Sequence, residues 1–280
     1  MTAPGRVAAF FDLDGTLLPA PSLEWRFISY LLWRDKLSTT NIMRWLLHTA
    51  RSIPRGPRRA MESNKRYLAG LRASLVGDWM DSLYTCGSNA EPFDVFEEGL
   101  NRIRWHQSQY HQVFLVSGTL APLAACVAGF LPGSVESIAT ELVVSVDDRT
   151  DPDHPAQIVE RDCHHVHAKN LPSVLWTGRL AGEHIVGTAK RRALQEIAKQ
   201  QNFDLHHCYA YGNSTADCAM LGAVGNPEAV NATPGLTRIA QKRGWPLSNW
   251  APVRSSPNEM YSRTKISTPL AQVATTERSR

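Results

Sequence analysis

Cysteine is scarce in this chain, and its scarcity excludes two classes of protein. The 280 residues include five cysteines, an odd number, and no two of them form a C-x-x-C pair. We therefore expect neither a disulfide framework nor a zinc knuckle, and the composition favours a reducing compartment. The cysteines are Cys86, Cys126, Cys163, Cys208 and Cys218.

No stretch of the sequence has the pattern of a membrane span or a secretory leader. The longest apolar run, residues 113–132, is broken by Ser117, Gly118 and Pro122, so we interpret it as strand, loop and helix. The N-terminal residues lack the basic and then apolar order of a leader. We therefore expect a cytoplasmic protein.

Acidic residues are rare between residues 26 and 72, where eleven lysines and arginines accompany only Asp35 and Glu62. Such a basic segment favours anionic partners, namely phosphorylated substrates, nucleic acid or an acidic membrane surface. A solvated helical face rich in arginine explains the same composition. We expect a small phosphorylated substrate and no nucleic acid, and we allow for peripheral membrane contact without expecting it.

Short apolar runs alternate along the chain with segments of helical spacing. We predict strands over residues 6–11, 111–119, 138–146 and 207–214, and helices over residues 91–109, 187–202 and 215–224, with a last strand and helix within residues 228–247. Strands that alternate with helices predict an α/β fold with a Rossmann-like, doubly wound parallel sheet.

The expected domain organisation follows from changes in this pattern. Residues 22–85 repeat their apolar positions at helical spacing, which predicts a helical cap over residues 21–87, inserted after the first strand. Residues 1–20 and 88–250 then form the catalytic core. Within it, the polar stretch 147–173 is expected to be an inserted loop. Residues 251–280 contain few apolar side chains, and we expect a disordered tail.

Two aspartates, Asp12 and Asp14, end the first predicted strand and are followed by Gly15 and Thr16. Successive side chains of a strand point to opposite faces, so the turn at Gly15 must curl the backbone before both carboxylates can address one point. A Mg²⁺ ion suits that point, because it binds hard oxygen ligands and accompanies phosphate. One carboxylate is then expected to attack phosphorus, and the other to transfer the proton.

Two further predicted strands end in polar residues, so their ends are expected to meet the two aspartates. Ser117 and the backbone N–H of Gly118 are candidates for binding phosphoryl oxygens, and Lys190 adds a positive charge. Asn213 and Asp217 are expected to complete the surroundings of the cation. Each motif alone has a simpler interpretation as a turn or a helix cap, and it is their combination that favours phosphate chemistry.

The four segments DLDGT, VFLVSGT, GTAKRRAL and YAYGNSTAD resemble the four motifs of the haloacid dehalogenase (HAD) superfamily, in order. A helical region between the first two motifs is typical of its phosphoserine phosphatase-like branch, which carries a helical cap. The resemblance implies Asp12 as nucleophile and Asp14 as general acid and base, with Ser117, Gly118 and Lys190 holding the phosphoryl group. It also implies an Mg²⁺ ion held by Asp12, the Asp14 carbonyl oxygen and the fourth motif.

The fourth motif departs from the commoner family pattern, because Asn213 stands where aspartate is usual. An amide oxygen is an uncharged ligand, so Asp217 is expected to bear more of the metal binding. This departure keeps open a binding or regulatory protein of low activity that uses its basic cap. A phosphotransferase with an acceptor other than water is a further alternative to a phosphatase that acts through an aspartyl-phosphate. The phosphatase is the leading interpretation.

Apolar residues at helical spacing also form a stripe in the predicted cap. Packing between cap helices is the default interpretation of this stripe. Together with Arg26, Arg34 and Arg44 it also allows an amphipathic surface for a phosphate attached to an apolar group, such as a lipid or prenyl phosphate. Glu24 and Arg26 are the candidate substrate contacts. The stripe consists of Trp25, Phe27, Tyr30, Leu31, Trp33, Met43, Trp45 and Leu46.

A cluster in residues 163–167, with Cys163, His164, His165 and His167, also permits a transition-metal interpretation. Because the second cysteine pair is missing, a solvated loop is the better interpretation. We therefore expect no zinc.

Overall fold

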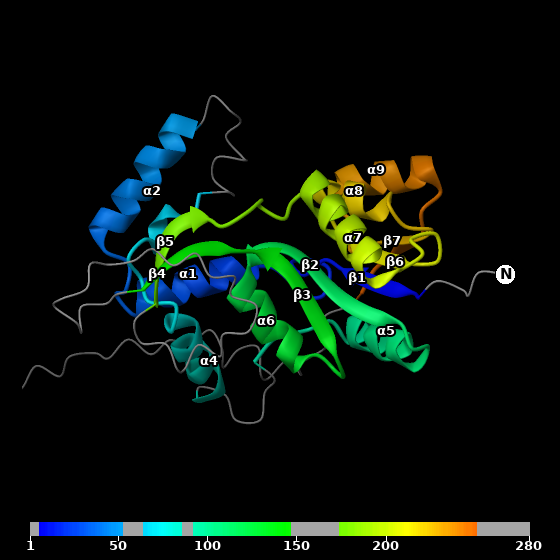
Figure 1. Cartoon of the computed structure of the whole chain (residues 1–280), viewed down its shortest axis with the longest axis horizontal. Coiled ribbons are helices and arrows are strands. Elements are labelled where there is room, and N and C mark those ends of the chain that lie inside the picture. Colours follow the sequence, from blue (N-terminus) through cyan, green and yellow to red (C-terminus); the bar gives the residue numbers. More distant parts are fainter. Residues whose placement is uncertain (1–5, 53–63, 86–91, 147–173, 251–280) are drawn as a thin grey trace, which may run out of the picture.

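A computed structural model of the chain describes residues 6–52, 64–85, 92–146 and 174–250 (Figure 1). The predicted inserted loop, the predicted tail and the cluster at residues 163–167 lie outside these residues. Six strands form one parallel sheet in the order β3-β2-β1-β6-β7-β8. The strands are β1 (Ala8–Phe11), β2 (Gln112–Leu120), β3 (Val135–Thr140), β6 (Tyr209–Gly212), β7 (Asn226–Val230) and β8 (Leu247–Ser248).

Helices cover both faces of this sheet, which confirms the predicted doubly wound α/β fold. Alternate residues of β1 point to opposite faces: Phe11 packs in the cluster that contains Ile103 of α5, and Phe10 in the cluster that contains Leu194 of α7. Both faces of β1 are therefore buried, which explains its uninterrupted apolar sequence. The helices of the core are α5 (Glu97–Ser108), α6 (Ala121–Phe130), α7 (Thr188–Gln201), α8 (Cys218–Leu221) and α9 (Pro234–Arg243), with the short 3₁₀ helix η4 (Thr215–Asp217).

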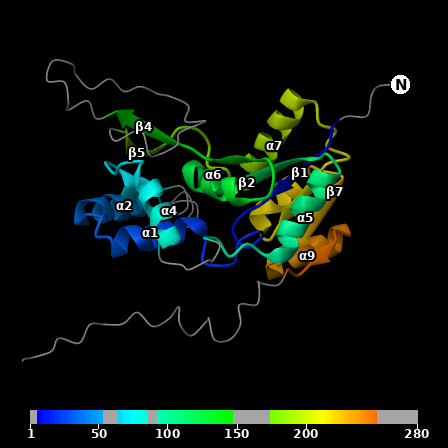
Figure 2. The ribbon, with the colours of Figure 1, turned by 90° about the horizontal axis from the view of Figure 1, so that it is seen from below.

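The segment between β1 and α5 is helical and lies beside the core, at the left of Figures 1 and 2. Its buried aromatic side chains pack together, with the Phe27 ring 5.4 Å from that of Trp79. The segment contains α1 (Leu23–Trp33), α2 (Thr39–Ser52), the 3₁₀ helix η2 (Arg66–Leu68) and α4 (Leu75–Thr85). No described helix is long and apolar enough to cross a membrane.

A second, two-stranded antiparallel sheet packs on these helices. It consists of β4 (Leu142–Val146) and β5 (Val174–Leu180). The Trp176 N–H donates to the Leu71 carbonyl at 2.9 Å, and its carbonyl accepts from the Gly70 N–H at 2.8 Å. Its indole is 3% exposed and packs edge-on against Phe27. The helical segment and this hairpin therefore bury a common apolar interior.

Three predicted elements differ from the observed ones. The strand predicted over residues 138–146 is broken at Glu141, because β3 ends in the main sheet and β4 joins the hairpin. The helix predicted from residue 91 begins at Glu97, since the Phe96 N–H donates instead to the Leu17 carbonyl at 2.9 Å. The helix predicted over residues 215–224 is the shorter pair η4 and α8.

His106 of α5 is fully buried beside the sheet, and its Nε2 lies 2.8 Å from the Tyr211 hydroxyl. Burial, with His111 and Arg102 nearby, lowers the pKa of His106 to about 3. The unfolded chain takes up this proton below about pH 6.5, whereas the folded chain does not. The stabilising effect is therefore present above pH 6.5 and lost as the pH falls.

We predict that the free energy of unfolding falls by about 1.4 kcal/mol per pH unit below pH 6.5 because of His106. Urea titrations between pH 7.5 and pH 5 should show a smaller decrease for His106→Gln than for the wild-type protein. The exposed His48 supplies the control, since His48→Gln should keep the wild-type slope. Equal slopes for the wild type and His106→Gln would contradict this assignment.

Candidate active site

The carboxyl ends of three neighbouring strands bring the predicted motifs to one edge of the sheet. Phe11 of β1 pairs with Leu115 of β2 on one side and with Tyr211 of β6 on the other. Asp12 follows that level by one residue, and its backbone N–H donates to the Tyr211 carbonyl at 2.9 Å. Ser117 and Asn213 each follow their paired residue, Leu115 or Tyr211, by two positions. They therefore lie at the carboxyl edge of the sheet, where doubly wound sheets bind ligands.

The turn after β1 gives the two aspartates different hydrogen-bond partners, whereas we predicted a curl that lets both carboxylates address one point. Gly15 has a φ of +86°, a left-handed conformation that favours glycine. Asp12 turns inward, and its Oδ2 accepts a hydrogen bond from the Thr16 hydroxyl at 3.0 Å. Asp14 turns towards α1, where its Oδ1 accepts from the Leu23 N–H at 2.7 Å. Thr16 thus positions Asp12, a role that we did not assign from the motif.

Lys190 is 3% exposed and joins the first and fourth motifs. Its Nζ donates to Asp12 Oδ1 and, at 2.6 Å, to Asp217 Oδ1. The other oxygen of Asp217 accepts from the backbone N–H and the hydroxyl of Ser214, each at 2.9 Å. The Asn213 N–H donates to it as well, at 3.2 Å. Asp12, Lys190 and Asp217 therefore form one buried hydrogen-bonded chain.

Burial and like charge control the titration of this group. Burial, followed by the neighbouring Asp217 carboxylate, raises the pKa of Asp12 to about 7 despite the opposing effect of Lys190. Burial lowers the pKa of Lys190, but the two carboxylates outweigh it, so the net shift is upward. Burial also raises the pKa of Asp14. The raised pKa values of Asp12 and Asp14 show that the positive charge of Lys190 does not fully balance the carboxylates of this site.

Ser117 and Gly118 lie at the same edge, within β2. Ser117 is 2% exposed, and its hydroxyl oxygen accepts from the Thr119 N–H at 3.2 Å. A Cβ atom at Gly118 would lie 2.6 Å from Cγ2 of Val186, so only glycine fits this close approach. The Gly118 carbonyl accepts from the Thr140 hydroxyl at 2.9 Å, which fixes the local backbone.

The predicted cation ligands provide oxygen atoms only, namely carboxylates, a backbone carbonyl and an amide. The site also holds the carboxylates of Asp12, Asp14 and Asp217 against the single ammonium of Lys190. Hard oxygen donors and excess negative charge fit Mg²⁺. Asn213 is close as well, because its Nδ2 lies 1.9 Å from where a Cβ of Gly15 would be. Among the described residues, no group of three His, Cys, Asp or Glu side chains is arranged as a metal site.

Glu24, one of the two candidate substrate contacts, is bonded within the helical segment between β1 and α5. Both of its carboxylate oxygens accept from Lys65 Nζ at 2.6 Å, and one of them also accepts from the Tyr67 hydroxyl. Lys65 is 4% exposed. Sequence reasoning missed Lys65 and Tyr67, because they follow Glu24 by about 40 residues and no motif links them.

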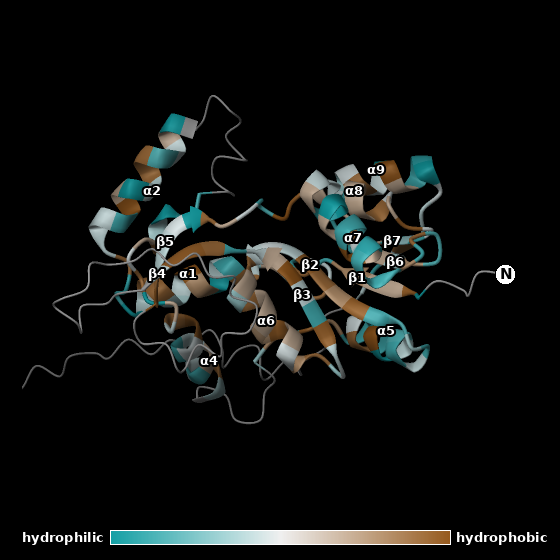
Figure 3. Cartoon of the chain, in the orientation of Figure 1, coloured by the Kyte–Doolittle hydropathy of each residue, from teal (hydrophilic) through white to brown (hydrophobic). Residues whose placement is uncertain are grey.

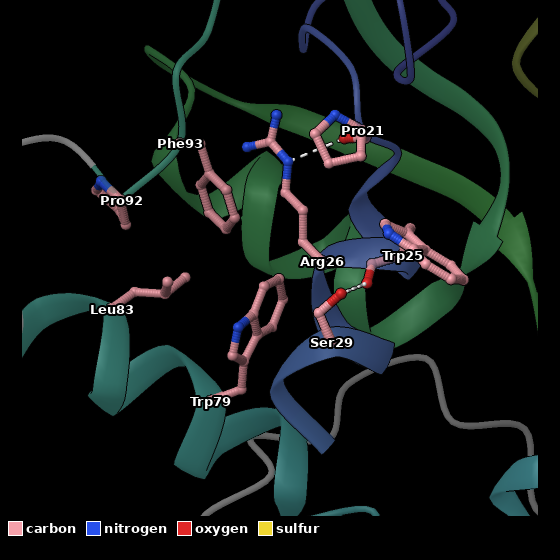
Figure 4. A pocket seen from close by; sticks show the side chains of 8 residues that line it. All are labelled: Pro21, Trp25, Arg26, Ser29, Trp79, Leu83, Pro92 and Phe93. Carbon is pink, nitrogen blue, oxygen red and sulfur yellow. Dashed lines mark hydrogen bonds between the residues drawn. The ribbon is translucent and has the colours of Figure 1, made fainter. Parts of the chain in front are cut away.

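Arg26, the other candidate, binds the segment that connects core and cap. Its guanidinium donates to the carbonyls of Pro19 at 2.6 Å and Pro21 at 2.9 Å. A cavity of about 380 Å³ adjoins it, between α1, α4 and residues 92–93. Figure 4 shows Trp79 and Leu83 projecting from α4 toward this space. The cavity is mainly apolar, with Arg26 as its charged group.

The model of the haloacid dehalogenase-like hydrolase family matches residues 9–170, and a second model of the same description matches residues 149–243. The chain therefore belongs to the haloacid dehalogenase-like hydrolases. This confirms the resemblance inferred from the four motifs, and with it the prediction of a hydrolytic enzyme.

Individual proteins agree with this assignment. The chain is 26% identical over 261 residues to the phosphoserine phosphatase SerB1 of Mycobacterium tuberculosis, covering 89% of this chain and 72% of that protein. The crystal structure of a Bordetella pertussis protein of unknown function is similar at a TM-score of 0.63 and 23% identity, over 87% of this chain and 98% of the other. A phospho-aspartyl intermediate analogue of phosphoserine phosphatase matches at a TM-score of 0.51 and 19% identity, over 92% and 99%.

Proposed function

We propose that this protein is a phosphatase that hydrolyses a phosphate monoester through an aspartyl-phosphate on Asp12. The observation that carries the proposal is the buried Asp12 carboxylate, oriented by Thr16 and Lys190 at the carboxyl edge of the sheet. A carboxylate held in this way attacks phosphorus without having to reorganise first. The structure with the phospho-aspartyl analogue, which shares this fold, supports the same chemistry.

The reaction takes place in two steps. An Asp12 oxygen forms a bond to phosphorus as the ester P–O bond breaks, and Asp14 gives its proton to the leaving alcohol oxygen. Water then attacks the phosphorus of the aspartyl-phosphate and gives a proton to Asp14. The bond between phosphorus and Asp12 breaks, which releases inorganic phosphate and restores the Asp12 carboxylate and the protonated Asp14 carboxyl group. Asp14 suits this role because its hydrogen bond to the Leu23 N–H holds it apart from the Lys190 chain.

Three groups bind the phosphoryl oxygens in this proposal: the Ser117 hydroxyl, the Gly118 N–H and Lys190. Their donors lie at the edge where Asp12 emerges, so the charge that develops on phosphorus meets fixed dipoles and a cation. Mg²⁺, held by Asp12, Asp217, Asn213 and the Asp14 carbonyl, would supply further charge neutralisation there. Asp217 accepts from three donors at one oxygen and from Lys190 at the other, so the ion would have to replace one of these donors to bind it.

We further propose that the non-phosphate part of the substrate is apolar and carries no ammonium group. Glu24 follows Leu23, whose N–H binds Asp14, and its negative charge adds to burial in raising the pKa of Asp14. It is therefore the carboxylate that an ammonium group of the substrate would approach. Lys65 and Tyr67 occupy its oxygens, which leaves little capacity to bind an ammonium. The apolar cavity beside Arg26 offers room for a hydrocarbon group. Phosphoserine is therefore a poorer candidate than an alkyl or prenyl phosphate.

Asp12→Asn should reduce phosphate release from butyl phosphate by at least about a thousandfold, because an amide cannot attack phosphorus. The assay is inorganic phosphate released in the presence of Mg²⁺, with added alcohol acceptors to reveal any phosphotransfer. Asp78→Asn, at an exposed position of α4, is the matched control and should keep wild-type activity. Folded Asp12→Asn protein with wild-type turnover would exclude the mechanism.

The substrate class is tested with two esters of nearly equal size. Butyl phosphate and 3-aminopropyl phosphate differ mainly in a terminal methyl or ammonium group. We predict a kcat/KM about tenfold higher for butyl phosphate, since an ammonium would have to be desolvated without a free carboxylate to receive it. A preference for 3-aminopropyl phosphate would overturn the substrate class and leave the mechanism at Asp12 untouched.

A further inference from the structure

The apolar stripe predicted for the cap is only partly buried. Phe27, Tyr30 and Leu31 belong to the core, as the packing interpretation requires. The remainder of the stripe includes Trp33 and Met43, which are 71% and 56% exposed. Of the twelve large hydrophobic side chains exposed in the described part of the chain, six lie on α2 and the last turn of α1: Leu32, Trp33, Ile42, Met43, Leu46 and Leu47.

The exposed side chains of α2 form one continuous stripe. Ile42 and Leu46 are four residues apart, as are Met43 and Leu47, so these pairs lie next to each other on the helix surface. In Figure 3, brown bands of hydrophobic residues alternate with teal ones along α2. Packing against the other described residues does not account for the four side chains of the stripe, because all four are exposed.

The other side of α2 is attached to the protein. The buried Asn41 side chain donates to the carbonyls of Tyr67 at 3.0 Å and Ala69 at 3.1 Å. The Trp45 carbonyl accepts from the Asn64 side chain at 2.8 Å, and its indole is half-buried against the core. These contacts fix the orientation of α2, and its apolar stripe faces away from residues 64–69 and the apolar core. Figures 1 and 2 both place α2 at the periphery, far from the parallel sheet.

Basic side chains accompany this stripe. Between residues 25 and 52 the only acidic residue is Asp35. The basic residues with exposed side chains there are Arg34, Lys36, Arg44 and Arg51. The Arg34 guanidinium lies over the Trp33 ring, 5.3 Å from its centroid. Arginine beside exposed tryptophan and aliphatic side chains matches the boundary between lipid headgroups and acyl chains.

We propose that this α2 surface, formed by Ile42, Met43, Leu46 and Leu47 with Arg44 and Arg51, binds peripherally to membranes that contain anionic lipids. Its charge complements anionic headgroups, and its apolar stripe is narrow enough to enter the outermost acyl region without spanning the bilayer. Binding at this surface is independent of the catalytic residues. It extends the proposed function, since it would place a phosphatase for apolar esters beside a lipid phase.

The test is co-sedimentation of the full chain with two kinds of vesicle. One contains phosphatidylcholine alone, and the other also contains about 30% phosphatidylglycerol, which gives the negative surface that anionic lipids produce in cells. We expect binding to the anionic vesicles that weakens at high salt. Met43→Ser with Leu47→Ser should weaken it about tenfold or more. Arg44→Gln with Arg51→Gln should weaken it about twenty-five-fold, at about fivefold for each charge.

Leu247→Ser is the matched control, because Leu247 is an exposed residue of β8 in the six-stranded sheet. This variant should bind vesicles as the wild type does. Each variant must keep wild-type circular dichroism and wild-type turnover of butyl phosphate, which separates loss of binding from loss of fold. Absence of binding to anionic vesicles would overturn the proposal. It would also be overturned if Met43→Ser with Leu47→Ser abolished a dimer in vesicle-free solution, because a second copy would then occupy the surface.

Discussion

Lys190 lies buried between two carboxylates, and this contact connects the three segments that carry the candidate catalytic residues. An ammonium at 3% exposure is costly unless it is paired, and Asp12 and Asp217 supply the pairing. The three residues belong to different elements, namely the end of β1, the first turn of α7 and the 3₁₀ helix η4. Their mutual contact therefore fixes the relative positions of the first, third and fourth motifs.

The cap depends on a comparable buried pair, Lys65 with Glu24, assisted by Tyr67. It joins η2 to the first turn of α1, whose Leu23 N–H binds Asp14. The Lys190 ion pair thus holds the first aspartate of the first motif, and the Glu24 pair lies on the helix whose N–H binds the second. The β4–β5 hairpin strengthens the same assembly through backbone hydrogen bonds to residues 70–73.

The core and the catalytic motifs could be predicted because their signals are local. Buried parallel strands are continuous apolar runs, and the polar residues at their ends follow immediately in sequence. The hairpin could not be predicted, since β5 pairs with β4 across residues 147–173 and its backbone also bonds to residues 70–73, about a hundred positions earlier. The partners of Glu24 were missed for a similar reason. The late start of α5 depends on the hydrogen bond from the Phe96 N–H to the Leu17 carbonyl. Helix propensity describes single residues and cannot predict such a long-range bond.

The account depends most on a covalent bond between Asp12 and phosphorus. The measurement that tests it most directly is chemical trapping during turnover: an acid quench with butyl phosphate and Mg²⁺ present, borohydride reduction, and mass spectrometry of the peptide that contains residues 7–19. An aspartyl-phosphate is reduced to homoserine, so the account predicts homoserine at position 12 and unchanged aspartate at position 14. Turnover with both aspartates unmodified, or with homoserine elsewhere, would contradict it.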